Sequence, residues 1–181
     1  VNPLAALLGA AGIGYYVFVY TLWLKRVSPL NVVIGGGAGA LPLLVGWVAV
    51  DGHLSADALW LGAVVVCWTP PHFWSLALVR RREYAVAGLP MLPVVRGAEE
   101  TRRQILLYCV ALLGLTMLLV PAGLAGPRFL GVALVLGLCL VIMAIRLVYQ
   151  ATDRAAWLLY RYSIVYLALL FGSMILDHIL Q

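Results

Sequence analysis

Long apolar runs, separated by short polar connections, are the feature that most constrains what this chain can fold into. A helix needs about 20 apolar residues to cross a hydrocarbon core of about 30 Å. The runs extend over residues 3–24, 31–50, 56–79, 105–120, 129–148 and 163–176. The fourth and sixth runs are short, so we expect their helices to extend into the flanking residues. The sequence therefore predicts six transmembrane helices.

The pattern inside these runs favours helices over the strands of a membrane barrel. Membrane β-strands alternate between apolar and polar residues, whereas stretches such as 59–67 and 132–145 are apolar throughout. Hydrophobic residues make up 65% of the 181-residue chain and charged residues 10%, compared with about 25% charged residues in a soluble domain. No repeat, low-complexity segment or linker divides the sequence. We therefore expect an all-α integral membrane protein in which residues 1–181 form a single domain.

The basic residues report the orientation of the chain in the membrane. The positive-inside bias assigns eleven of the twelve to cytoplasmic helix ends. They are Lys25, Arg26, Arg80, Arg81, Arg82, Arg96, Arg102, Arg103, Arg146, Arg154 and Arg161. The connection 80–104 is thus expected to be a cytoplasmic loop, and its length favours a functional role. The same bias places residue 1 outside, so an odd number of preceding helices is expected.

Two further features of the composition exclude common functions. The net charge of +5 does not indicate nucleic-acid binding, because the basic residues stand at helix ends. Cys67, Cys109 and Cys139 each lie alone inside an apolar run, which indicates packed or lipid-facing side chains rather than metal ligands. The expected location is a cell membrane, most simply a bacterial plasma or inner membrane, crossed several times.

The third apolar run ends in a motif that combines two prolines with an ionisable side chain, residues 68–74, WTPPHFW. Adjacent prolines remove two backbone donors, so we expect a broken helix beside a polar cavity. His72 lies about two turns before Arg80, at membrane depth. With Trp68 it offers an aromatic and imidazole surface suited to a flat apolar ligand such as a porphyrin. The alternative is a structural histidine bonded to a neighbouring helix.

Charged residues gather directly after this run. Arg80–Arg82 precede Glu83 and Tyr84. Guanidinium groups bind phosphate oxygens, and a carboxylate can hold an Mg²⁺ that the same phosphates share, so the pattern favours a diphosphate ligand. The alternative is that the arginines anchor the helix at the interface and that Glu83 pairs with one of them. Lys25 and Arg26, expected on the same side of the membrane, either reach the same site or serve as anchors.

The glycine-rich run 35–40 has two readings. It faintly resembles a phosphate-binding loop, but no strand precedes it and the lysine that ends such loops is absent. Small residues four apart instead favour close packing between helices. We therefore expect this run to be a packing surface.

Taken in order, these motifs resemble the protohaem IX farnesyltransferase family, also called haem O synthases, among the UbiA-type prenyltransferases. The segments that carry the resemblance are 20–26, 31–47, 68–74, 83–93 and 162–167, with Asp177. The resemblance implies six helices of a nine-helix bundle, with the first three absent. It also implies transfer of the farnesyl group of farnesyl diphosphate to a vinyl group of protohaem IX, giving haem O and diphosphate for terminal oxidases.

The resemblance also implies roles for particular residues. Glu83 stands where many members have aspartate, and is expected to bind Mg²⁺ together with an Asn/Asp motif in the absent helices. This chain alone is therefore expected to be inactive. Glu83 and His72 are the expected catalytic residues. The expected diphosphate ligands are Lys25, Arg26, Arg80, Arg81, Arg82 and Tyr84. The expected haem-side residues are His72, Trp68 and Trp74.

Other functions stay open at this point. Another UbiA-type enzyme would use a different aromatic acceptor, such as a quinone precursor, although His72 and the segment 90–93 speak against it. A haem carrier, an assembly factor or a small transporter with a broken third helix is the non-enzymatic alternative. The expected partners are protohaem IX and farnesyl diphosphate as substrates, membrane lipid, and a haem A synthase or an oxidase assembly protein. No nucleic acid is expected.

Overall fold

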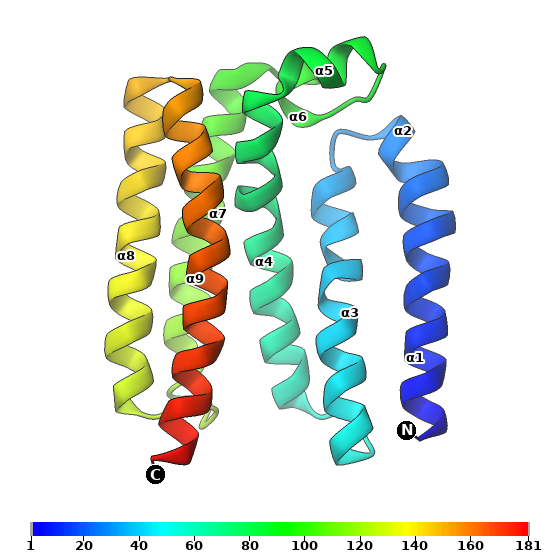
Figure 1. Ribbon diagram of the computed structural model, residues 1–181, viewed down its shortest axis with the longest axis vertical. Helices are drawn as coiled ribbons and strands as arrows, with labels where there is room; N and C mark the ends of the chain where they lie inside the picture. The colour runs from blue at the N-terminus through cyan, green and yellow to red at the C-terminus, as the bar shows by residue number, and fades with distance from the viewer. Residues whose placement is uncertain (1, 181) are drawn as a thin grey trace.

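The chain forms a row of long helices with two short helices across one end (Figure 1). The computed structural model describes residues 2–180, and this part of the chain contains helices and turns without a β-strand. The long elements are α1 (Pro3–Gly14) continued by η1 (Tyr15–Leu24) and α2 (Lys25–Val27), α3 (Asn31–Asp51), α4 (Ala56–Val79), α7 (Gly97–Leu118), α8 (Pro127–Gln150) and α9 (Asp153–Ile179). The short ones are α5 (Arg81–Val86) and α6 (Leu92–Val95).

Within residues 2–180, six helices are long and apolar enough to cross a membrane, which confirms the predicted number. The fourth and sixth helices extend into their flanks as expected. For α7 the reason is local, because Arg103 pairs with Glu99 at 2.6 Å and Gln104 bonds Glu100 at 2.8 Å across single turns. Those pairs allow the helix to begin at Gly97. The expected loop 80–104 is therefore a shorter connection that contains α5 and α6.

The expected break at Pro70 and Pro71 is absent from the structure, because α4 is one continuous helix from Ala56 to Val79. Proline at position 70 removes the N–H that would bond the carbonyl of Val66. That carbonyl faces Gly36 of α3, where an added Cβ would stand 3.4 Å from its oxygen. A neighbouring helix thus covers the freed carbonyl, which is how a membrane helix tolerates proline.

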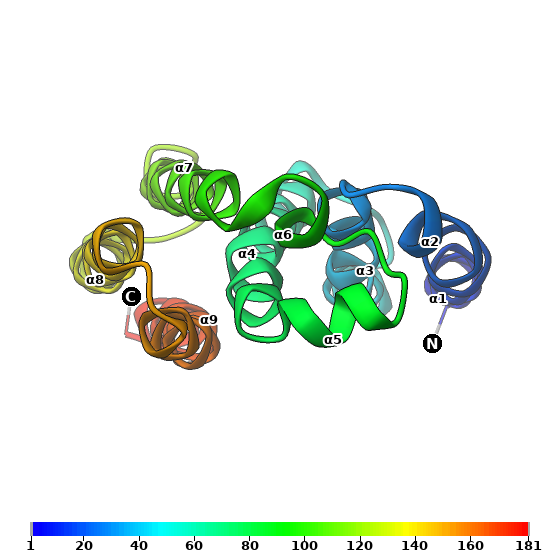
Figure 2. The same ribbon diagram turned by 90° about the horizontal axis from the view of Figure 1, so that it is seen from above.

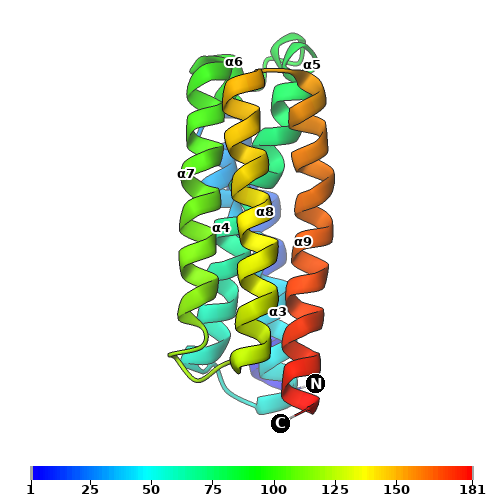
Figure 3. The same ribbon diagram turned by 90° about the vertical axis from the view of Figure 1, so that its left-hand side faces the viewer.

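The centre of the molecule is α4, which contacts α3, α7 and α9. Seen from above, α4 lies between α3 on one side and the group of α7, α8 and α9 on the other (Figure 2). The last three long helices stand side by side over their whole length (Figure 3). At the far edge of the row, α1 packs on α3 alone among the long helices.

The glycine-rich run lies in α3 at its contacts with η1 and α4. An added Cβ on Gly35 would stand 2.5 Å from two ring carbons of Tyr20, and one on Gly36 would stand 3.3 Å from Cβ of Thr69. Side chains at these positions would push the helices apart. The predicted packing surface is therefore confirmed.

Candidate functional site

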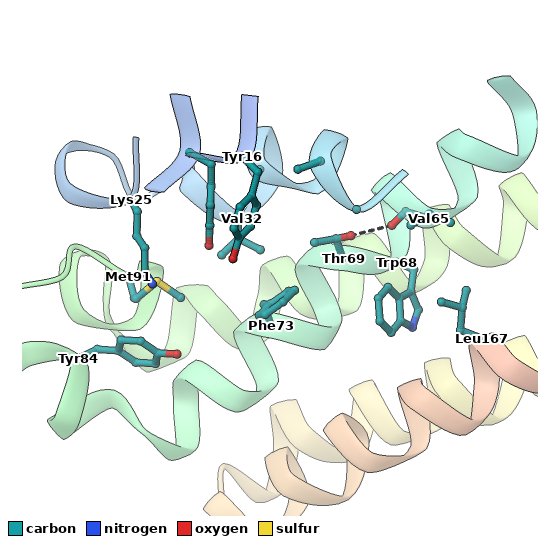
Figure 4. Close-up of a pocket in the computed structure, with 14 residues that line it drawn as sticks. Tyr16, Lys25, Val32, Val65, Trp68, Thr69, Phe73, Tyr84, Met91 and Leu167 are labelled. Atoms are coloured by element: carbon teal, nitrogen blue, oxygen red, sulfur yellow. Dashed lines mark hydrogen bonds between the residues drawn. The ribbon is translucent and has the colours of Figure 1, made fainter. Parts of the chain in front are cut away.

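A cavity of about 420 Å³ opens between η1, α3 and α4, close to the end of the molecule that carries α2 and α5. We call it the main pocket. Its lining residues are Tyr16, Tyr20, Lys25, Val32, Gly35, Ala38, Gly39, Val65, Trp68, Thr69, Phe73, Tyr84, Met91 and Leu167. The set comes from seven segments of the chain, so packing of the helices creates this pocket (Figure 4).

One end of the main pocket is rich in hydrogen-bond donors. Lys25 approaches from α2, Tyr84 from α5 and Tyr16 from η1, and the three side chains project toward the same region (Figure 4). The ring of Tyr20 stacks on that of Tyr16, with centroids 5.5 Å apart. An ammonium group and phenolic hydroxyls can all donate to the oxygens of an anion. This end of the pocket therefore suits a phosphate-type group.

The tyrosines of η1 were missed by the sequence analysis. The segment Tyr15–Leu24 is a π-helix, a rare geometry that is often found at functional sites. Two side-chain bonds hold it, since Thr21 Oγ1 donates to the carbonyl of Tyr16 at 2.8 Å and Tyr15 Oη donates to that of Ile34 at 2.7 Å. An apolar run contains no signal for this geometry. The pair of tyrosines four residues apart, just before Lys25, is the signal that could have found them.

The other end of the main pocket is apolar. Its walls include Trp68 and Phe73 from α4 and Leu167 from α9. The indole of Trp68 is fixed in place, because its Nε1 donates to the carbonyl of Ser163 at 2.8 Å. Together with the donor-rich end, these walls make a pocket for a molecule with a charged head and a hydrocarbon body.

His72 lies in an aromatic stack between α4 and α9. Its ring stacks on Trp68 with centroids 4.3 Å apart and on Tyr160 with centroids 4.7 Å apart. Its Nδ1 is 2.8 Å from Oγ of Ser163, which itself donates to the carbonyl of Tyr160 at 2.6 Å. Because a hydroxyl has one hydrogen, Nδ1 must be the donor to Ser163, which leaves the lone pair on Nε2. The side chain is 8% exposed.

This geometry bears on the two interpretations of His72. The bond to Ser163 is the contact with a neighbouring helix that the structural alternative required. Among the described residues, those that line the main pocket include Trp68 and Phe73 beside His72, but not His72 itself. His72 therefore supports the aromatic wall from behind, and a haem-side role for it stays a prediction.

The charged cluster after α4 is paired within itself. Arg80 Nη1 lies 2.8 Å from Oε2 of Glu83, and both side chains are at least half exposed. The hydrogen bond to Glu83 raises the pKa of the Arg80 guanidinium. Arg81 bonds Oδ1 of Asp153 at 2.6 Å and so ties α5 to α9. The anchoring interpretation of this cluster thus has direct contacts in its favour.

The expected Mg²⁺ ligand is a single carboxylate, that of Glu83, which pairs with Arg80 in the structure. Among residues 2–180, no group of three or more His, Cys, Asp or Glu side chains could hold a metal. Mg²⁺ is commonly bound by one or two carboxylates together with substrate phosphates. Glu83 directly precedes Tyr84, which lines the pocket. Glu83 therefore fits as a single ligand to an Mg²⁺ whose remaining ligands come from elsewhere.

All predicted site residues fall within the described chain, and the structure divides them. Lys25, Trp68 and Tyr84 line the main pocket. Arg26, Arg80, Arg82 and Glu83 are exposed and do not line it, although Arg26 and Glu83 directly adjoin lining residues in the sequence. Arg81 is half-buried and bonds Asp153 of α9. Trp74 is 1% exposed and meets the ring of Tyr108 of α7 edge-on, with centroids 5.4 Å apart. It therefore packs between α4 and α7, and the expected haem-side role for Trp74 stays a prediction.

The described chain is thus a bundle of membrane-spanning helices around a pocket with a donor-rich head and an apolar body. The chain belongs to the UbiA prenyltransferase family, whose family model matches residues 1–172. The resemblance inferred from the motifs is thereby confirmed. The chain is part of a multi-pass membrane protein.

Comparison with curated proteins gives closer relatives. The chain is 54% identical to the protoheme IX farnesyltransferase of Roseiflexus sp. (strain RS-1), over 99% of this chain and 34% of the relative. It is 50% identical to the protein of that name from Gloeobacter violaceus, over 98% of this chain and 59% of the relative. For the one from Azoarcus sp. (strain BH72), identity is 48% over 100% of this chain and 60% of the relative. The chain thus spans between a third and three-fifths of these relatives. No solved structure matches it.

Proposed function

We propose that the intact protein containing this chain transfers the farnesyl group of farnesyl diphosphate to a vinyl group of protohaem IX, giving haem O and diphosphate. The observation that carries the proposal is the polarity of the main pocket, with Lys25 and tyrosine hydroxyls at one end and an apolar body beyond. An allylic diphosphate has the same division between a charged head and a hydrocarbon chain. Relatives that carry the corresponding name, at 48–54% identity, support this substrate.

The diphosphate is held by Lys25 and by the hydroxyls of Tyr16, Tyr20 and Tyr84. Exposed arginines next to this end, Arg26, Arg80 and Arg82, attract the anion and add charge at the pocket mouth. Mg²⁺, bound in part by Glu83, would neutralise the diphosphate as it leaves. These groups stabilise negative charge that grows as the bond from the first farnesyl carbon to the diphosphate oxygen breaks.

Breaking this bond leaves a farnesyl carbocation, and the walls of the pocket surround it. Trp68, Phe73 and the tyrosine rings exclude water and present aromatic faces, which attract a cation. The vinyl group of protohaem supplies an electron pair to the first farnesyl carbon, and a carbon–carbon bond forms. The cation left on the former vinyl group then takes a hydroxyl from water and releases a proton.

The acceptor side is proposed from residues next to the aromatic wall. His72 keeps a lone pair on Nε2, because Nδ1 donates to Ser163. That nitrogen can take up a proton or bind the haem iron, so we keep His72 with Trp68 on the haem side. The basic residues at the α5 end favour a cytoplasmic position for that end, and we propose a cell membrane as the location. Since haem O is hydrophobic, a haem A synthase or an oxidase assembly protein in the same membrane is the proposed recipient.

The test is to extract haem from cells that produce the intact protein and to compare it with haem from cells that lack it. A new haem with the added mass of a farnesyl group and a hydroxyl is the expected result, and it should disappear in the Lys25→Ala variant. Unchanged protohaem together with a prenylated quinone precursor would instead favour the other aromatic acceptor. Unchanged protohaem with no prenylated product would favour a carrier or assembly role.

A further inference from the structure

A second cavity, of about 150 Å³, lies where α6 meets α7, close to the start of α3. We call it the α6 pocket. Seen from above, α6 lies between α7 and α3 (Figure 2). The polar and aromatic residues that line the cavity are Trp74, Arg96, Glu100, Gln104 and Tyr108. None of its lining residues lines the main pocket, so the two cavities are separate.

The polarity of the α6 pocket changes along one face of α7. Glu100, Gln104 and Tyr108 are four residues apart, so they lie one above the other over about 12 Å. Arg96 stands just before the first turn of this helix. From the α5 end inward, the lining therefore changes from charged groups through an amide to a phenol. A phospholipid changes in the same order, from a charged head group through ester groups to hydrocarbon.

The two charged side chains of the α6 pocket are held apart. Arg96 and Glu100 both line it, yet among residues 2–180 no ion pair joins them and Arg96 has no other ion-pair partner. Glu100 accepts a hydrogen bond from Gln104 at 2.8 Å through one carboxylate oxygen, which leaves the other available. A cation and an anion that share a cavity without touching are complementary to a ligand that carries both charges.

A buried donor beside this pocket lacks an acceptor. Trp74 is 1% exposed, and its Nε1 has no hydrogen-bond partner within the described chain. Leaving such a donor unsatisfied is costly, so a ligand or bridging water that brings an oxygen to it is favoured. Phosphate and ester oxygens of a phospholipid are acceptors of this kind.

The apolar part of the lining reaches the surface of the molecule. Leu30 is 51% exposed, and Val33 lies half-buried one turn further along α3. The pocket thus has charged groups at the end of the helices and apolar side chains beside them, as the boundary between head groups and hydrocarbon requires. A soluble zwitterion would leave these apolar side chains uncovered, whereas the acyl chains of a lipid would cover them.

We propose that the α6 pocket binds the head group of an amine-bearing phospholipid, with its phosphate at Arg96 and its ammonium at Glu100. Phosphatidylethanolamine has this chemistry. Phosphatidylglycerol lacks the ammonium, and the quaternary ammonium of phosphatidylcholine has no N–H to donate to Glu100, so both bind more weakly. The inference goes beyond the proposed function and does not depend on it. Leu92 and Val33 directly follow Met91 and Val32 of the main pocket, so the bound head group packs behind the wall of that pocket.

The test is native mass spectrometry of the intact protein in detergent micelles, with each of the three phospholipids added separately with the same acyl chains. The unaltered protein should retain phosphatidylethanolamine in preference to the other two. Glu100→Gln removes the charge that holds the ammonium, so this preference should fall by about tenfold. Arg96→Gln should lower the retention of all three lipids, because each carries a phosphate.

Two neighbouring charges on α7 provide matched controls. Glu99 and Arg103 pair with each other at 2.6 Å, are well exposed and do not line the α6 pocket. Glu99 lies in the same first turn as Glu100, so its replacement has the same effect on the helix dipole. Glu99→Gln and Arg103→Gln should therefore leave the order and the extent of lipid retention unchanged.

Thermal melts of the same variants give a second measurement. Added phosphatidylethanolamine should raise the Tm of the unaltered protein and of Glu99→Gln more than that of Glu100→Gln. Equal retention of the three lipids by the unaltered protein, or an equal loss of preference in Glu99→Gln and Glu100→Gln, would overturn the inference. Stabilisation by inorganic phosphate alone, to the same extent as by the lipid, would indicate a site for a free anion and would overturn the lipid assignment.

Discussion

The hydroxyl of Ser163 joins α9 to α4 at a buried position, and its removal gives the sharpest test of the geometry beside the main pocket. Ser163 is fully buried, and His72 is 8% exposed. In Ser163→Ala, Nδ1–H of His72 loses its acceptor at 2.8 Å. The bond from Trp68 to the backbone carbonyl of Ser163 remains. The variant therefore isolates the histidine contact.

The expected magnitude follows from the cost of leaving a buried donor unsatisfied, about 1–3 kcal/mol. Alanine is a better helix former than serine, and this gain offsets about 0.5 kcal/mol of the lost stability. Ser173→Ala provides the control on the same helix, because its hydroxyl bonds the carbonyl of Leu170 within α9. The helix-propensity gain is the same in both variants, so the difference between them measures the contact with His72.

The assay is reversible denaturant unfolding of the intact protein in mixed micelles, followed by tryptophan fluorescence. Ser163→Ala should lower the free energy of unfolding by about 1–3 kcal/mol more than Ser173→Ala does. In a His72→Phe background this difference should largely vanish, because both hydrogen-bonding partners are then gone. Equal losses for the two serine variants in the unaltered background would refute the assigned bond and, with it, the tautomer of His72.

Three further predictions concern the activity of a Glu83 variant, the stability of two glycine variants, and the activity of the 181-residue chain. Glu83→Gln should lower prenyl transfer by at least about tenfold, with partial recovery at high Mg²⁺, while Glu83→Asp stays mild; wild-type turnover and Mg²⁺ dependence in the Gln variant would remove Glu83 from the metal site. Gly35→Ala should displace Tyr20 and cost about 1–3 kcal/mol of stability, whereas Gly37→Ala, with its nearest contact at 3.9 Å, should be tolerated; thermal melts of the pair check this. The purified 181-residue chain should show no farnesylation in the mass-spectrometric assay.

The number and kind of helices could be determined from sequence alone. A bilayer imposes a minimum length on any apolar helix, and this rule acts on each segment without reference to its neighbours. The same holds for the basic residues at helix ends, since charge is excluded from hydrocarbon wherever the chain folds. Lys25 and Tyr84 could accordingly be predicted near one site, because each stands directly beside such an end, and both line the main pocket.

Only the tertiary structure shows which face of each helix meets the main pocket. A helix that is apolar all round has no periodicity to reveal which side meets a pocket, so the sequence did not show that Tyr16 and Tyr20 line the main pocket or that Trp74 packs against α7. The π-geometry of η1 decided the first case, and packing against Tyr108 of α7 decided the second.

Contacts between segments distant in sequence also required the structure. The prolines of α4 predicted a break, but Gly36 of α3 packs over the freed carbonyl of Val66 and the helix continues. Likewise, Ser163 lies far along the chain from His72, and only the packing of α9 on α4 makes it the acceptor that fixes the ring. Propensity and hydrophobicity act locally along the chain, whereas the bonding of a buried polar group depends on whichever helix packs beside it.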